Sequence, residues 1–310
     1  MKKIRLIFIG TAEIGIPLLK TLVLDDRFEM ASVVTAMDRP AGRGLATQPS
    51  PIKKSAEALR LPVLEPVDIN SSESVARLQA LKPDLILLLA YGQILKQPIL
   101  ELPAKGCINV HGSLLPRHRG ASPLQSALLA EDRDTGISLM QMVEKMDAGP
   151  VYAIFSIPIE PEDNASRLHD KLAKLAAEKT PEALIQIVSG KIKTKPQDEA
   201  QATYSKKLSR ADGVINWSED VVTIARKIRA YWGWPGSYTT FNGKHLKILA
   251  GVPSKEKGEL GMVFEKSEKI LVGAAQGSLE LTTVQLEGKK VMSVQEFIKG
   301  YPDFIGIKLG

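Results

Sequence analysis

The chain has 310 residues, of which 44% are hydrophobic and 25% are charged, a composition typical of soluble globular proteins. It contains no uninterrupted apolar run of about 20 residues, which excludes a membrane-spanning helix, and its single cysteine excludes an intramolecular disulfide. No spacing of His, Cys, Asp and Glu resembles a metal site. We therefore expect a soluble, cytoplasmic protein without a metal, long enough for two domains.

The first 189 residues alternate apolar runs with helical patterns. Ile4–Gly10 is too short for a signal peptide and lacks a cleavage site, so it is predicted to be a buried first strand. Further strands are predicted over Met30–Thr35, Leu61–Leu64, Leu85–Ala90, Cys107–His111 and Ile137–Val143, and helices over Ala12–Leu24, Ser74–Leu81 and Ala165–Val188. Strands interleaved with helices predict a mostly parallel, doubly wound, Rossmann-like α/β sheet. Ligands of such sheets bind beyond the carboxyl ends of the strands.

The pattern changes after Ser189-Gly190, where the long helix is expected to end, because Lys191–Ala202 is polar and has no periodicity. We expect an N-terminal domain over 1–189, a linker over 190–208 and a C-terminal domain over 209–310. The last contains a helical pattern, Ser218–Ala230, and five short apolar runs, Ser237–Phe241, Leu246–Ala250, Gly261–Phe264, Ile270–Ala274 and Leu279–Gln285. Five short strands with regular turns predict a small OB-like β-barrel.

The positive charge is concentrated in the C-terminal third. From Lys206 to the end there are 16 Lys or Arg against 11 Asp or Glu, while the preceding residues hold 25 against 24. This asymmetry is typical of a protein with a polyanionic partner such as nucleic acid. A lysine-rich, solvated surface would explain the excess equally well.

Asn109 and His111 form the clearest candidate site, at the end of the predicted strand Cys107–His111. Side chains at positions i and i+2 of a strand point to the same face, so the amide and the imidazole should share one cleft. An amide donor can stabilise charge that develops on a carbonyl oxygen, and an imidazole can move a proton. The pair therefore indicates acyl transfer. The alternative is that both side chains merely satisfy the backbone of a loop.

Asp147 lies in a loop closed by Gly149-Pro150, after the predicted strand Ile137–Val143. A carboxylate at this place could orient His111 and stabilise its protonated form, or accept a proton from an attacking amine. The alternative is a loop aspartate that caps backbone N–H groups. Together with Asn109 and His111, it supplies a third catalytic role.

Other motifs are weaker. Gly10-Thr11-Ala12-Glu13-Ile14-Gly15 follows a strand, but Ala12 replaces the second glycine of the dinucleotide-binding pattern, which disfavours an NAD-dependent oxidoreductase. Absence of a G-x-S-x-G motif disfavours a serine hydrolase. Cys107 is predicted to be a small buried hydrophobe, and His118 a surface or substrate-contact residue. The loop Asp38–Gly44 carries two arginines that could grip phosphates, although a solvated surface loop explains it as well.

The run Asn109-Val110-His111-Gly112-Ser113-Leu114-Leu115-Pro116, with Asp147 downstream, resembles the formyltransferases that use 10-formyltetrahydrofolate. The similarity continues through Ala90-Tyr91-Gly92-Gln93-Ile94-Leu95, Arg39-Pro40-Ala41-Gly42-Arg43-Gly44 and Trp232-Gly233-Trp234-Pro235, and so covers essentially the whole chain. The order and spacing resemble the branch of this family that formylates methionyl-tRNA. The resemblance implies a formyltransferase domain followed by a tRNA-binding barrel, acting as a monomer.

The same resemblance implies roles for individual residues. Asn109, His111 and Asp147 would be the catalytic set. The folate pocket would be lined by Tyr91, Gly92, Ile94, Leu95, Ser113, Leu114, Leu115 and Pro116, partly through backbone groups. Arg39, Arg43 and Arg117 would contact the initiator methionyl-tRNA, whose methionine amine accepts the formyl group. His118 departs from the family pattern, in which tryptophan is expected at this position.

Related activities remain open at this point. A formyltransferase that acts on an amino sugar nucleotide, or a hydrolase that releases formate from 10-formyltetrahydrofolate, would share the catalytic trio. The arginine loop and the basic C-terminal part favour tRNA as the acceptor. A non-catalytic RNA-binding protein is disfavoured by the intact trio.

Overall fold

The computed structural model describes residues 2–41 and 46–310, which form two compact units. The N-terminal unit comprises the residues up to Pro123, together with Asp134–Pro158 and His169–Ser205. The C-terminal unit comprises Leu124–Arg133, Ile159–Leu168 and Lys206–Gly310. Within the described part of the chain, no helix combines the length and the apolar character needed to cross a membrane.

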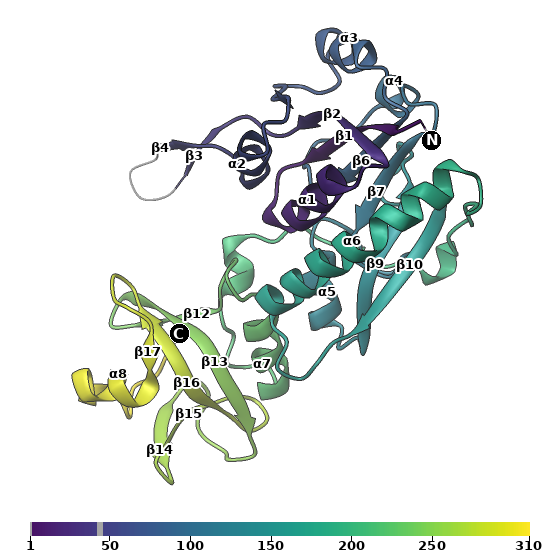
Figure 1. Ribbon diagram of the computed structural model, residues 1–310. Coiled ribbons are helices and arrows are strands. Elements are labelled where there is room, and N and C mark those ends of the chain that lie inside the picture. Colours follow the sequence, from purple (N-terminus) through teal and green to yellow (C-terminus); the bar gives the residue numbers. More distant parts are fainter. Residues whose placement is uncertain (1, 42–45) are drawn as a thin grey trace. The chain divides into compact units, whose positions relative to one another are not determined.

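A seven-stranded sheet forms the centre of the N-terminal unit (Figure 1). Its strands are β1 (Ile4–Gly10), β2 (Phe28–Val34), β5 (Val63–Leu64), β6 (Leu85–Leu89), β7 (Cys107–His111), β9 (Asp134–Gln141) and β10 (Val151–Pro158), in the order β10-β9-β7-β6-β1-β2-β5. From β5 to β7 all neighbours are parallel, as predicted. The β9 and β10 strands extend this sheet in antiparallel fashion, which the sequence pattern did not indicate.

Helices cover both faces of this sheet, because its central strands are apolar on both sides. They are α1 (Ile16–Leu24), α2 (Pro51–Ala58), α3 (Ser72–Ala80), α4 (Gln97–Leu100) and α6 (Ala165–Val188). Leu78 of α3 and Ile99 of α4 pack in one core cluster with Ile7 and Ile86 of the sheet. The doubly wound, Rossmann-like prediction is therefore confirmed.

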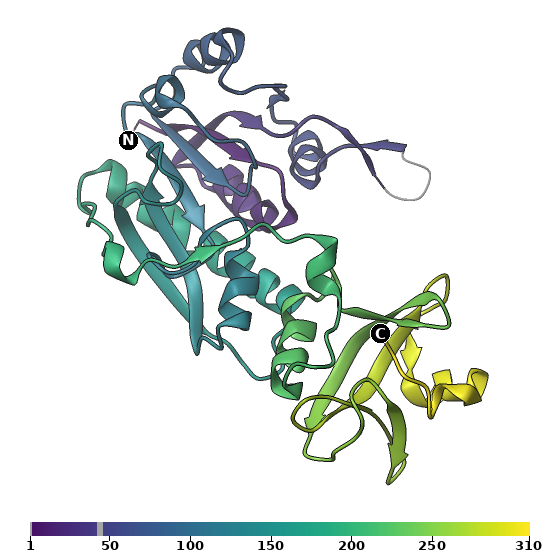
Figure 2. The same ribbon diagram turned by 180° about the vertical axis from the view of Figure 1, so that it is seen from behind.

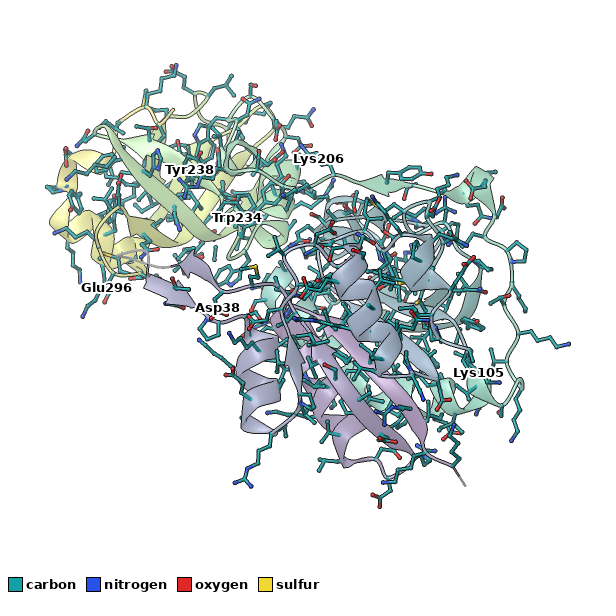
Figure 3. The ribbon with its side chains drawn as sticks, turned by 90° about the horizontal axis from the view of Figure 1, so that it is seen from above. Asp38, Lys105, Lys206, Trp234, Tyr238 and Glu296 are labelled. Atoms are coloured by element: carbon teal, nitrogen blue, oxygen red, sulfur yellow. The ribbon has the colours of Figure 1, made fainter. Side chains whose placement is uncertain are left out.

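A small antiparallel hairpin, β3 (Arg39–Ala41) and β4 (Ala46–Gln48), follows β2 where a loop was expected. Lys53 on α2 forms ion pairs at the base of this hairpin. The Lys53 ammonium lies 2.9 Å from the carboxylate of Asp38 and 2.8 Å from that of Glu65. Asp38 is labelled in Figure 3. These two carboxylates, Glu65 first, raise the pKa of Lys53 above its usual range.

Residues 195–205, here called the strap, belong to the N-terminal unit, although they lie inside the segment expected to be a linker. At one end, Lys195 exchanges two backbone hydrogen bonds with Val151. At the other, β11 (Tyr204–Ser205) pairs in parallel with β8 (Arg119–Gly120). Between them lies the short 3-10 helix Glu199–Gln201. Figure 2 shows the strap, in teal-green, passing over the sheet.

The C-terminal unit is built around an antiparallel sheet in the order β12-β13-β16-β15-β14, with β17 paired to β16. Its elements are α7 (Val221–Ala230), β12 (Tyr238–Phe241), β13 (Lys244–Ser254), β14 (Val263–Lys266), β15 (Lys269–Gly273), β16 (Ser278–Leu286), β17 (Met292–Ser293) and α8 (Val294–Gly300). The unit also includes most of α5 (Pro123–Leu129). The curled sheet surrounds one hydrophobic core and agrees with the predicted OB-like barrel. The short α8, capped by a Ser293–Glu296 capping box, was not predicted.

Candidate functional site

Asn109 and His111 project from one face of β7, as their spacing requires. Both side chains are buried, with 7% and 6% of their surface exposed. The Asn109 amide nitrogen lies 3.5 Å from one carboxylate oxygen of Asp147, and Nδ1 of His111 lies 3.7 Å from the other. The structure therefore brings the three residues predicted to act together into one cluster.

Asp147 belongs to the loop between β9 and β10 and has a left-handed backbone, with φ of +49°. Its carboxylate oxygen Oδ2 accepts a hydrogen bond of 2.7 Å from the backbone N–H of Gly120. The same oxygen is the one that faces His111. Gly120 is an additional site residue that sequence reasoning missed. The Arg119-Gly120 dipeptide after the Pro116 turn was the only available signal.

The His111 ring is held from its far side by a main-chain group. Its Nε2 lies 2.9 Å from the carbonyl oxygen of His118. A carbonyl can only accept, so Nε2 carries a hydrogen and donates it. The neutral ring then has its lone pair on Nδ1, which faces Asp147. When Nδ1 also gains a proton, the imidazolium lies between two acceptors. This arrangement suits a proton shuttle.

The expectation that His118 lies at the surface is wrong. The residue is 6% exposed and has a φ of +57°. Its backbone N–H donates to Thr203 Oγ1 at 2.8 Å, and its carbonyl accepts from His111. Pairing between β8 and the strap covers this segment, which the local sequence could not indicate. His118 therefore contributes to the site through its main chain.

Two chain segments, residues 2–184 and 207–302, match the family models Formyl transferase and Formyl transferase, C-terminal domain. The chain belongs to the formyl transferase family. It is 40% identical to a methionyl-tRNA formyltransferase of Geobacter sulfurreducens over 100% of this chain and 98% of that protein. It is also 39% identical to one of Bacillus licheniformis, over 99% and 98% of the two chains.

Solved structures share the formyltransferase fold at lower identity. HypX from Aquifex aeolicus in complex with tetrahydrofolic acid has a TM-score of 0.64 and 18% identity, over 98% of this chain and 48% of that one. WlaRD, a sugar 3N-formyl transferase, has a TM-score of 0.66 and 17% identity, over 94% of this chain and all of that one. These similarities support the architecture described above.

The two segments expected to hold folate in this formyltransferase follow β6 and β7. In the first, Tyr91 and Leu95 are buried in the core, and Ile94 exposes 62% of its surface. Gly92 has a φ of +99°, and a Cβ there would meet nothing within 4 Å. The exposed Ile94 side chain and the open backbone at Gly92 would suit a ligand that has an apolar ring system with polar edges.

The second segment is rigidly held. Ser113 is fully buried and donates to the Arg117 carbonyl at 2.6 Å. The Ser138 hydroxyl accepts from Leu115 N–H and donates to the Ser113 carbonyl. Leu114 and Pro116 are half-buried, and Arg117 is exposed. A rigid main chain of this kind can present fixed donors and acceptors to a ligand.

The remaining predicted residues are those of the arginine loop. Arg39 begins β3. Arg43 lies outside the residues that the structure describes. Over residues 2–41 and 46–310, no group of three or more His, Cys, Asp or Glu side chains is arranged to hold a metal ion.

Proposed function

We propose that this formyltransferase transfers the formyl group of 10-formyltetrahydrofolate to the amino group of methionyl initiator tRNA, giving N-formylmethionyl-tRNA for translation initiation. The observation that carries the proposal is the cluster of the buried Asn109 and His111 with the partly buried Asp147 at the carboxyl end of β7. The acceptor is inferred from full-length relatives that are named methionyl-tRNA formyltransferases. Such an enzyme acts in the cytoplasm, where tRNA is charged, and we expect it to act as a monomer.

The reaction forms a bond between the methionine nitrogen and the formyl carbon, and breaks the bond from that carbon to N10 of the folate. One amine proton is lost, and N10 gains one. The amide of Asn109 would donate to the formyl oxygen as negative charge develops there. His111, hydrogen-bonded through Nε2 to His118, would help to stabilise that charge and carry a proton on Nδ1. Asp147 would orient the ring and assist removal of the amine proton.

Folate would lie against residues 91–95 and 113–116, which border the site after β6 and β7. Residues 1–189 would form the catalytic domain, and the basic barrel over 209–310 would lie along the tRNA backbone. Arg39, Arg43 and Arg117 would contact the tRNA phosphates, for which guanidinium groups are well suited.

A comparison of acceptors tests this proposal. The protein is incubated with 10-formyltetrahydrofolate and, in separate reactions, with methionyl initiator tRNA, an amino sugar nucleotide or water alone. Formylmethionine on tRNA is the expected product. Formylation of the sugar nucleotide without formylation of tRNA, or release of formate as the only product, would overturn the assignment.

A further inference from the structure

Arg119 is the largest fully buried side chain in the described part of the protein, with 0% of its surface exposed. Among the described residues, the hydrogen-bond partners of its guanidinium group all lie in the strap. Nε and Nη2 donate to the Gln197 amide oxygen, Nη1 and Nη2 donate to the Glu199 carboxylate, and Nη1 also donates to the Tyr204 hydroxyl. Burying a cation is costly unless its N–H donors form hydrogen bonds, so these contacts hold the strap against Arg119.

The charges of this cluster reinforce one another. The hydrogen bond from Arg119 holds the pKa of Glu199 at about 2, and the Glu199 carboxylate raises the pKa of Arg119. Lys145, in the loop that carries Asp147, also lies 3.3 Å from Glu199. The Arg119–Glu199 pair therefore stays ionised at neutral pH.

Gln197 connects this cluster to the loop between β9 and β10, which carries Asp147. Its amide oxygen accepts from Arg119 at 3.0 and 2.8 Å. Its amide nitrogen donates to the backbone carbonyls of Asp147 at 2.8 Å and of Gly149 at 2.7 Å. Because the guanidinium group has no acceptor, the amide can bond in only one orientation. Both hydrogens of the amide nitrogen thus point at the loop.

Asp147 needs such support. A left-handed backbone strains a residue that carries a side chain, although aspartate tolerates it better than most, and the conformation is held by the surrounding contacts. The Asp147 carbonyl is held by Gln197, and its carboxylate is held by the Gly120 N–H, next to Arg119. A Cβ on Gly120 would lie 2.4 Å from the Ser205 carbonyl, so glycine lets the strap approach this donor.

We propose that Gln197, oriented by the buried Arg119, is a positioning residue that fixes Asp147 relative to His111, which makes the strap part of the catalytic machinery. This inference rests on the proposed function. The strap also holds the other anchor of His111, because Thr203 accepts from the His118 N–H and its carbonyl accepts from the Arg119 N–H. Misplacement of a catalytic group by about 1 Å can reduce turnover by about 100-fold.

Gln197→Glu is the sharpest test. A glutamate keeps an oxygen for Arg119 but cannot donate to the two loop carbonyls. Gln79→Glu makes the same change at an exposed position of α3, outside the strap, and serves as the control. We expect Gln197→Glu to lower kcat by about 10- to 100-fold with little change in either KM, and to shift the pH profile of kcat. The control should retain the activity of the unmodified protein.

A double-mutant cycle separates positioning from general loss of structure. In an Asp147→Ala background, Gln197→Glu should cost little further activity, because the residue that it positions is already absent. Gln197→Ala, which adds no charge, should give the same cycle, and thermal denaturation reports folding of each variant. Full activity of Gln197→Glu, or an equal loss with and without Asp147, would overturn the positioning role. Failure of the unmodified protein to formylate methionyl-tRNA would overturn the proposed function instead.

Discussion

The Asp147 carboxylate lies 3.7 Å from Nδ1 of His111. The other ring nitrogen, Nε2, donates to the His118 carbonyl. The two acceptors thus lie at opposite ends of one imidazole. A ring held in this way can gain a proton at Nδ1 without rotating, which favours a stationary proton shuttle.

Asp147→Asn removes the negative charge from this pair and keeps an oxygen for the Gly120 N–H. The neutral amide oxygen that accepts from the Gly120 N–H cannot stabilise an imidazolium at His111 as the carboxylate does, so we expect kcat to fall by about 100-fold or more, with both KM values nearly unchanged. Steady-state formylation kinetics measure this. The control is Asp170→Asn, because Asp170 forms an exposed pair with His169, 3.0 Å apart. Equal kcat in the two variants would exclude a proton-transfer role for Asp147.

Lys53→Met removes the cation that joins Asp38, at the base of the β3–β4 hairpin, to Glu65. If the hairpin contacts tRNA, the KM for tRNA should rise several-fold, and the KM for folate should not change. Lys54→Met, one residue further along α2 and exposed, should leave both values unchanged. A parallel rise in the folate KM would show that the ion pairs support the whole domain rather than the hairpin.

Tyr91→Phe removes a hydroxyl that is buried without a hydrogen-bond partner among the described residues. Burial raises the pKa of Tyr91 to about 12. An unpaired buried hydroxyl destabilises the folded state, so the free energy of unfolding should stay the same or rise by about 1 kcal/mol. The KM for folate should not change, because the Tyr91 hydroxyl is buried in the core and away from the surface that a ligand would contact. Denaturant titration and kinetics check the two statements, and weaker folate binding would place the phenol in the pocket.

Cys107 is a buried hydrophobe, as predicted, with 2% of its surface exposed. Burial raises the pKa of its thiol from 9.0 to about 12, so a thiol reagent at pH 8 should react only as the protein unfolds. The folded state prefers the neutral thiol. Its contribution to stability is therefore complete below pH 9 and is lost as the pH rises towards 12. Cys107→Ala should lack this part of the alkaline decline, and rapid labelling of the native protein would contradict the assigned burial.

Strong local patterns in the sequence predicted the first and last residues of some elements correctly. The bounds of β1, β7 and α6 are those expected, because each is a long apolar or periodic run between clear breakers. The proximity of Asn109 and His111 followed from strand geometry alone. Asp147 could be added only through its loop position and the family resemblance, since the contact joins residues 38 positions apart.

The missed features depend on contacts between distant segments. The β3–β4 hairpin has the Gly, Pro and Arg composition of a loop, and the ion pair of Asp38 with Lys53 joins its base to α2. The segment with Gln197 has no periodicity, because its conformation is set by Arg119, 78 residues earlier in the chain. A surface position was one of the two expected for His118, because Thr203 of the strap that covers it lies 85 residues further along the chain. Tertiary hydrogen bonds of this kind leave no local signal in a sequence.

The central claim is formyl transfer to methionyl-tRNA by the Asn109–His111–Asp147 cluster. Its most direct test compares the unmodified protein with Asn109→Ala in one assay that contains 10-formyltetrahydrofolate and methionyl initiator tRNA. We predict formylmethionyl-tRNA from the unmodified protein, and turnover reduced by about 100-fold or more in a folded variant, as for a lost oxyanion donor. Near-equal turnover of the two proteins, or no formylation by either, would contradict the account.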